Sequence, residues 1–225
     1  MGNVIGDILP LAIGVAISPV PIIAVILMLF SARARTNGPA FLAGWIVGLA
    51  VVGTIVLVLS DSGDLSADSG PSNAAGVVQL ILGVLLLLAS LRRWRSRPTA
   101  GEEPEMPKWL ASVDGLTPVK AASFGVLLSG VNPKNLLLSI GAAVAIGQAG
   151  LGTGQQIGAL VIFVVLGSIT VALPVVYSLL GGEGAVARLE TAKGWLAANN
   201  STVMFVLLLV FGVVLIGKAI GILSS

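Results

Sequence analysis

The 225-residue sequence contains neither cysteine nor histidine. The absence of cysteine excludes disulfides, thiolate metal sites and a cysteine nucleophile, and the absence of histidine removes the commonest proton shuttle and zinc ligand. Charged residues are also scarce, at 10%, whereas an ordinary soluble domain carries about a quarter. Apolar residues make up 56% of the chain, and the mean hydropathy is +1.05. This balance argues against a water-soluble fold and predicts an all-α integral membrane protein.

The apolar parts of the sequence contain no carboxylate pair, histidine or cysteine. No pair of carboxylates lies at mid-depth in any apolar stretch, and no glycine-rich phosphate-binding loop is present. The first absence argues against an enzyme, and the second against an ATP-driven pump. We therefore expect no enzymatic activity, no cofactor, no bound metal and no nucleic-acid partner.

Six apolar stretches are long enough to cross the hydrocarbon core of a bilayer, which takes about 20 residues. They are Ile8–Phe30, Ala40–Leu59, Ala75–Leu91, Ala121–Ala149, Ile157–Leu180 and Thr202–Leu223. No basic residue precedes the first stretch, so we expect it to remain a helix rather than to be cleaved as a signal peptide. A segment with four prolines separates the first three stretches from the last three. The prediction is a three-helix repeat at 1–91, a cytoplasmic linker at 92–120 and a second repeat at 121–225.

The basic residues between the stretches predict the orientation, because Lys and Arg gather in cytoplasmic loops. The basic residues of the first, third and fifth loops are Arg33, Arg35, Arg92, Arg93, Arg95, Arg97, Lys108, Lys120, Arg188 and Lys193. The charged residues of the second loop are all acidic, and the fourth loop has no charged residue. The odd loops, including a fifth predicted at 181–201, are thus expected in the cytoplasm and both termini outside. Arg92–Arg97 would also suit anionic lipid headgroups, although topology alone requires basic residues there.

An odd number of helices in each half means that the second half runs opposite to the first. At an offset of 114 residues (132 − 18), Ser18-Pro19 falls on Asn132-Pro133. At the same offset, glycines 38, 44 and 53, in or just before the second stretch, fall on glycines 152, 158 and 167. This coincidence predicts two inverted three-helix repeats, an architecture known from secondary transporters.

Prolines break the first helix of each predicted repeat. Pro19 and Pro21 interrupt the first stretch, and Asn132-Pro133 interrupts the fourth. Proline removes a backbone donor and clashes with the preceding turn, and irregular backbone at membrane depth is tolerated only against protein or a water-filled cavity. Each break is open to two interpretations, a kink that serves packing or part of a substrate cavity. The pairing of two breaks at corresponding depth favours the cavity.

Lys134 lies about 13 residues into its stretch (134 − 121), where insertion of a charge costs about 2.5–3.5 kcal/mol. Freed carbonyls, the amides of Asn132 and Asn135, serine hydroxyls, water and an anion carried by the substrate are all possible partners. The alternative is a lysine that reaches the membrane interface because its helix starts later, the explanation we favour for Lys218 near the end of the last stretch. The residues predicted to bind substrate are Ser18, Pro19, Pro21, Asn132, Pro133, Lys134 and Asn135.

These motifs resemble a known family. Ser18-Pro19-Val20-Pro21, the loop that ends at Gly38, Phe41–Trp45 and Asn132–Leu138 are similar to the glycolipid-addressing proteins of mycobacteria, which include the sulfolipid- and peptidoglycolipid-addressing proteins of the lysine exporter (LysE) superfamily. The resemblance covers nearly the whole chain. Amino-acid exporters of that superfamily tend to have Pro-Gly-Pro where this chain has Ser18-Pro-Val-Pro. This difference weakens the inference that the chain shares their amino-acid substrate.

The resemblance implies a multi-pass protein of an actinobacterial plasma membrane that exports or delivers a cell-envelope glycolipid to the surface. Its expected partners are a membrane lipid or lipid-linked substrate, an anionic headgroup, a larger lipid export complex and further copies of itself. Two alternatives stay open at this point. One is a proton-coupled exporter of a small solute, such as an amino acid or ion, and the other is an accessory subunit of a lipid export complex.

Overall fold

The computed structural model describes residues 1–61, 73–95, 113, 115–181 and 183–224, which form helices and no strands. The first half contains α1 (Gly2–Ala16), α2 (Pro19–Phe30), α3 (Ala34–Asp61) and α4 (Asn73–Arg95). The second half contains α5 (Pro118–Val126), the π-helical turn η2 (Leu127–Val131), α6 (Pro133–Gly147), α7 (Thr153–Leu180) and α8 (Glu183–Leu223). The predicted all-α fold is confirmed for the described residues.

Four of these helices, α3, α4, α7 and α8, are each long and apolar enough to cross a membrane. The bent pair of α1 and α2 makes a fifth span if it is counted as one. The stretch predicted at 121–149 is divided into two shorter apolar helices, Pro118–Val131 and Pro133–Gly147. Several long apolar helices in one chain are typical of a multi-pass membrane protein.

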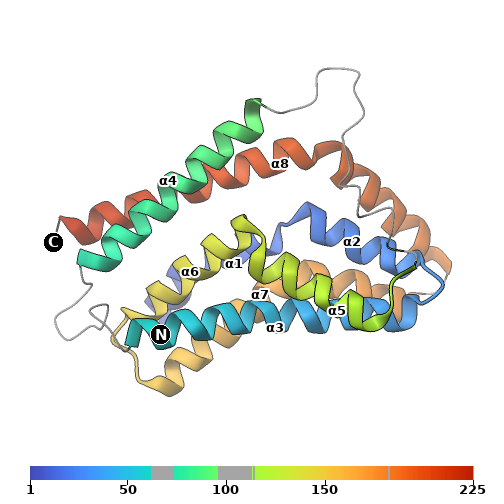
Figure 1. The fold of residues 1–225 in the computed structure, drawn as a ribbon, viewed down its shortest axis with the longest axis horizontal. Helices are drawn as coiled ribbons and strands as arrows, with labels where there is room; N and C mark the ends of the chain where they lie inside the picture. The colour runs from blue at the N-terminus through green and yellow to red at the C-terminus, as the bar shows by residue number, and fades with distance from the viewer. Residues whose placement is uncertain (62–72, 96–112, 114, 182, 225) are drawn as a thin grey trace.

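The loop predicted at 181–201 is wrong, because α8 begins at Glu183 and continues without interruption to Leu223. Its first part is rich in Ala, Leu, Glu, Arg and Lys, which are strong helix formers. Hydropathy locates the part of a helix that suits lipid and says little about where the helix itself starts. Figure 1 shows that α8 changes direction between this first part and the part that runs beside α4.

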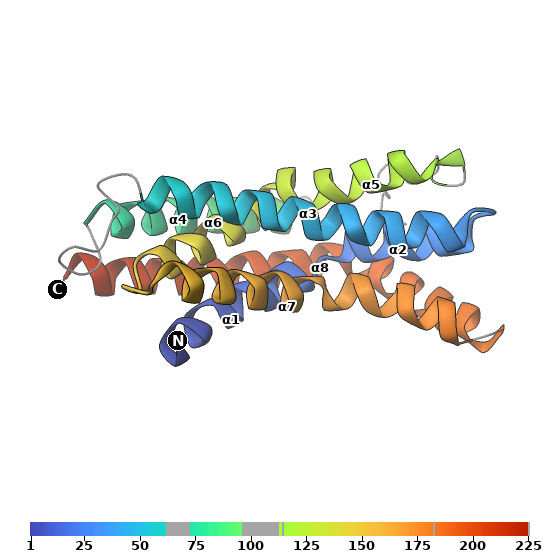
Figure 2. The same ribbon diagram turned by 90° about the horizontal axis from the view of Figure 1, so that it is seen from below.

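The helices run along the longest axis of the molecule and reverse direction at its two ends. Both termini lie at the same end, where α3 finishes and α4 and α7 begin (Figure 1). At the opposite end α2 is joined to α3 and α7 to α8, and Figure 2 shows the same arrangement from below. The α2–α3 and α7–α8 connections therefore lie at the end of the molecule opposite the termini.

Two groups of helices pack against each other. Helices α4 and α8 pair along most of their length, while α1, α2, α3, α5, α6 and α7 form the remainder of the bundle (Figure 1). Glycines permit the closest approaches. A Cβ on Gly83 of α4 would lie 2.9 Å from the carbonyl oxygen of Gly212 on α8, and one on Gly44 of α3 would collide with the backbone of Ala122 on α5. These contacts fix the α4–α8 pair and bring α3 against the segment that leads to the second proline break.

Candidate functional site

The first break lies between α1 and α2, whose axes differ by 51°. Every α-helix ends with four carbonyl groups that have no N–H partner within the helix. Here Pro19 and Pro21 have no N–H to offer the carbonyls of Val15 and Ile17, which lie four residues before them. The N–H of Ser18 bonds two residues back instead of four. The break thus gathers free carbonyl oxygens at the end of α1, which is also the negative end of its helix dipole.

Two hydroxyl groups satisfy part of this cluster. Ser18 Oγ lies 2.7 Å from the carbonyl oxygen of Val15, to which it can donate. Thr170 Oγ1 of α7 donates to the carbonyl oxygen of Ala16. A buried carbonyl without a partner costs about 1–3 kcal/mol, so these hydroxyls stabilise a break that lipid could not solvate.

Lys134 of α6 satisfies two further carbonyls of the same cluster. Its Nζ donates to the carbonyl oxygens of Gly14 at 2.5 Å and Ile17 at 3.0 Å. It also donates to Ser18 Oγ at 2.7 Å. An ammonium group has three N–H donors, so these three acceptors match it completely. The lysine connects the second half of the chain to the break in the first half.

The second break lies between η2 and α6. The proline at the start of α6 has no N–H, and the N–H of Asn132 bonds to the carbonyl of Leu127, five residues back, which widens the helix into a π-turn. The Asn132 side chain then caps α6 by accepting the backbone N–H of Lys134 at 3.1 Å. Asn135 Nδ2 donates to the carbonyl oxygen of Leu128 at 2.9 Å. Two asparagines therefore replace the backbone bonds that this break removes.

The two breaks meet in one buried network, which we call the break cluster: Ser18, Lys134 and Asn135. Ser18 Oγ lies 3.0 Å from Asn135 Oδ1, in addition to its bond with Lys134. The three side chains are 1%, 4% and 0% exposed, respectively. The hydrogen-bond partners that the structure gives to the Lys134 ammonium are all uncharged. When Lys134 is protonated, none of these partners is an anion that balances its charge.

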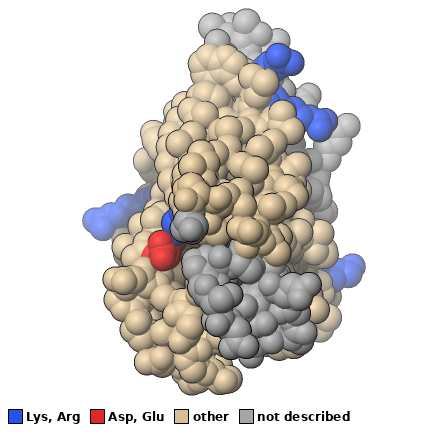
Figure 3. All heavy atoms as spheres, turned by 90° about the vertical axis from the view of Figure 1, so that its left-hand side faces the viewer, with Lys and Arg blue, Asp and Glu red and all other residues tan. Residues whose placement is uncertain are grey.

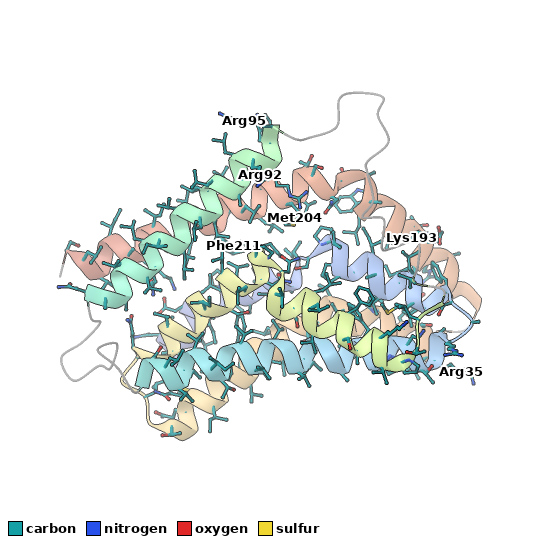
Figure 4. The ribbon with its side chains drawn as sticks, viewed as in Figure 1. Arg35, Arg92, Arg95, Lys193, Met204 and Phe211 are labelled. Atoms are coloured by element: carbon teal, nitrogen blue, oxygen red, sulfur yellow. The ribbon has the colours of Figure 1, made fainter. Side chains whose placement is uncertain are left out.

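A pocket of about 700 Å³ adjoins the break cluster and lies between α4, α6 and α8. Its described lining residues comprise three cations, one amide and five apolar residues: Arg92, Arg93, Lys134, Asn132, Leu88, Ala89, Pro133, Met204 and Leu208. Figure 4 labels Arg92 on α4 and Met204 on α8, on the sides of these helices that face the rest of the bundle. The pocket thus joins positive charge to apolar surface, and none of these lining residues is acidic.

The structure separates the predicted substrate-binding residues into three groups. Asn132, Pro133 and Lys134 line the pocket. Ser18 and Asn135 are buried behind it in the break cluster. Pro19 and Pro21 are buried at the start of α2 and shape the first break without lining the pocket. The predicted meeting of the two breaks is confirmed, while the binding of substrate by these residues stays a prediction.

Four residues of this site were missed as members of it. Thr170 gave no signal, because a threonine in an apolar stretch is common and its partner is 154 residues away. Met204 is one of many apolar residues of α8. Arg92 and Arg93 were noted as a basic cluster, but only the packing of α4 against α8 and α6 places them beside Lys134.

Comparison with known families gives a match across most of the chain. The model of a family described as Sap, sulfolipid-1-addressing protein, matches residues 8–221. No curated protein and no solved structure matches the chain. The matched range includes both breaks, the basic end of α4 and all helices that line the pocket.

Proposed function

Since the chain belongs to the sulfolipid-1-addressing protein family, we propose that it exports an anionic cell-envelope lipid or delivers it to the cell surface. The observation that carries this proposal is the pocket between α4, α6 and α8. Lys134, Arg92 and Arg93 supply three positive charges to it, and five apolar residues complete its lining. A lipid with a sulfate, phosphate or carboxylate headgroup matches this combination of charge and apolar surface.

The chains of such a lipid have a route beside the pocket. Leu88 and Ala89 of α4 and Leu208 of α8 line it together with the arginines, and the outer faces of both helices expose large apolar side chains such as Val84, Leu85 and Val213. A headgroup in the pocket can therefore remain attached to acyl chains outside the α4–α8 pair. A free amino acid or ion would make no use of this apolar surface, which favours the lipid over the small-solute alternative.

Lys134 gives the proposal a mechanism. With its three donors on Gly14, Ile17 and Ser18, the ammonium holds the end of α1 in its bent position. An anionic headgroup that enters the pocket competes for those donors, because a charged acceptor binds an ammonium more strongly than a neutral carbonyl does. If one N–H of Lys134 donated to the headgroup instead of to a carbonyl of α1, the 51° bend would be held less firmly. Binding would in this way be coupled to movement of α1 against α6.

The arrangement of the two halves supports the inverted repeat that we include in the proposal. Helices α3 and α7 are both 28 residues long. Helix α1 contacts α7 as α5 contacts α3, and α2 contacts α8 as α6 contacts α4. Such reciprocal contacts are expected of six spans in two inverted three-helix repeats, as in the LysE superfamily. The termini would then face outside and the basic loops the cytoplasm of an actinobacterial plasma membrane.

Transport by the purified protein tests the proposal. Liposomes with and without the protein would carry trace fluorescent phosphatidylglycerol or phosphatidylcholine, and an impermeant quencher would report movement between leaflets. We expect movement of the anionic lipid only, its loss in Lys134→Met and a smaller decrease in Arg92→Gln. Arg95→Gln is the matched control, because Arg95 ends the same helix without lining the pocket. Wild-type protein that binds phosphatidylglycerol but does not move it would instead indicate an accessory subunit.

A further inference from the structure

A second pocket, of about 560 Å³, lies at the end of the molecule that holds both termini. Four elements contribute to it: α1 with Asp7, α4 with Gln79, the end of α6 with Gln148, and α8 with Lys218. It lies apart from the cavity beside the break cluster and shares no lining residue with it. We call it the terminal pocket.

The lysine of the terminal pocket is neutralised. Lys218 Nζ lies 2.7 Å from a carboxylate oxygen of Asp7 and also donates to the Asp7 carbonyl oxygen at 2.9 Å. The structure thus gives Lys218 an ion-pair partner near the other end of the chain, while its extension to the membrane interface stays a prediction. Figure 3 views the molecule from this end, where an acidic and a basic group meet on a face that is otherwise mostly uncharged.

Two amide groups in the same pocket have unsatisfied polar atoms. Gln79 is 2% exposed, and its Oε1 has no hydrogen-bond partner among the described residues. Gln148 Nε2 is likewise buried without a partner there. An unpaired buried amide atom is unfavourable unless something fills its hydrogen-bonding capacity. Two residues of one pocket lining, Gln79 and Gln148, therefore contribute an acceptor and a donor whose hydrogen-bonding capacity is unused among the described residues.

We propose that the terminal pocket binds the hydroxyl groups of a sugar or polyol, held by Gln79 and Gln148 beside the Asp7–Lys218 pair. A hydroxyl group is both donor and acceptor, so neighbouring hydroxyls can satisfy Gln79 Oε1 and Gln148 Nε2 at once. An anion is a poor fit, because it cannot donate to Gln79 and meets the carboxylate of Asp7. That the sugar belongs to a lipid headgroup rests on the proposed function, whereas the binding of hydroxyls does not.

Lipid retention in nanodiscs tests this site. Phosphatidylcholine discs would contain either monoglucosyl diacylglycerol or phosphatidylglycerol, and native mass spectrometry would count the lipid that stays bound. Gln79→Leu should lower retention of the glucosyl lipid by roughly fivefold, the effect expected for one neutral hydrogen bond, and leave phosphatidylglycerol unchanged. Gln155→Leu, which alters an exposed glutamine on α7, is the control and should change neither.

Unchanged retention of the glucosyl lipid in both Gln79→Leu and Gln148→Leu would overturn the proposal. A fall in Tm of Gln79→Leu in sugar-free discs would also overturn it, because the amide would then have a structural partner. Competition by maltose would support a hydroxyl site open to free sugars, and its absence would place the sugar in a headgroup. Wild-type protein that retained the glucosyl lipid but not phosphatidylglycerol would overturn the proposed anionic pocket and leave the terminal pocket standing.

Discussion

The break cluster and the terminal pocket each contain a lysine, and the two lysines have different kinds of partner. Lys134 bonds to two carbonyls and a hydroxyl, so no anionic partner balances its charge when it is protonated. Lys218 bonds to the carboxylate of Asp7, which cancels its charge. In the two proposals, the site with neutral partners binds an anion, whereas the site with a carboxylate partner binds uncharged hydroxyls. The identity of the partners therefore indicates more about ligand chemistry than the presence of a lysine does.

The largest expected effect comes from removing the uncancelled charge. Lys134→Met should reduce movement of phosphatidylglycerol in liposomes at least about tenfold, which corresponds to about 1.4 kcal/mol of lost binding. It should also lower the free energy of unfolding by about 1–3 kcal/mol, because the carbonyls of Gly14 and Ile17 lose their donor. Lys134→Arg should restore part of the transport.

Lys218→Met is the matched control for Lys134→Met, since it removes the lysine whose charge is already cancelled. Its effect on phosphatidylglycerol movement should be less than about twofold, as expected for a partly exposed ion pair. Equal losses in the two variants would show that the difference between their partners is irrelevant to the ligand.

Removal of Asn135 should affect stability strongly, because its amide bonds to the Leu128 carbonyl and lies beside Ser18 in the fully buried cluster. We expect Asn135→Leu to lower the free energy of unfolding by about 2–3 kcal/mol, the cost of leaving buried polar groups unpaired. Denaturant unfolding in detergent, followed by circular dichroism, measures this. Asn199→Leu, which alters a half-exposed amide of α8, is the control. A similar loss in both would contradict a special role for the break cluster.

Substitution of a pocket arginine should have a moderate effect on lipid binding. Arg92→Gln should weaken retention of phosphatidylglycerol in nanodiscs by roughly fivefold, the size of about 1 kcal/mol for a partly exposed charge. The difference from wild type should shrink as salt is raised from 0.05 to about 0.5 M, because screening weakens exposed charges. Arg95→Gln should retain the lipid as wild type does. A salt-independent loss would argue against a charge contact.

The smallest expected effect comes from removing the carboxylate of the terminal pocket, so that its lysine, like Lys134, has no anionic partner. Asp7→Asn leaves Lys218 without its carboxylate, so this pocket becomes positive. Retention of phosphatidylglycerol should then rise by about twofold, in keeping with the weak energetics of an exposed pair. A decrease, measured in the same nanodiscs, would show that the charge balance of the pocket does not select its ligand.

Much of the break cluster could be predicted from the sequence, because its causes are local. Two prolines in one apolar stretch and Asn132-Pro133 in another specify breaks, and a lysine next to the second break needs partners. The sequence left those partners open, since carbonyls, amides and a bound anion all satisfy an ammonium. The choice of Gly14 and Ile17 depends on the contact of α1 with α6, which no local pattern records.

The pocket and the terminal site depend on contacts between distant parts of the chain. Arg92 lies beside Lys134 only because α4 pairs with α8 over the start of α6. Asp7 and Lys218 are 211 residues apart, and each alone looks like an ordinary interfacial charge. The start of α8 was missed for another reason, because its polar first part lacks the hydropathy by which spans are recognised.

Ser18 has a consequence for the timing of any movement at the breaks. Its hydroxyl carries one hydrogen, yet both Val15 O at 2.7 Å and Asn135 Oδ1 at 3.0 Å lie within its reach. Rotation about a single bond thus moves that hydrogen from an acceptor in one half of the chain to an acceptor in the other. Side-chain rotations of this kind take picoseconds to nanoseconds, far less than the microseconds of helix movement. The hydrogen bond between the halves can form and break many times before any helix shifts, so it does not limit the rate of helix movement.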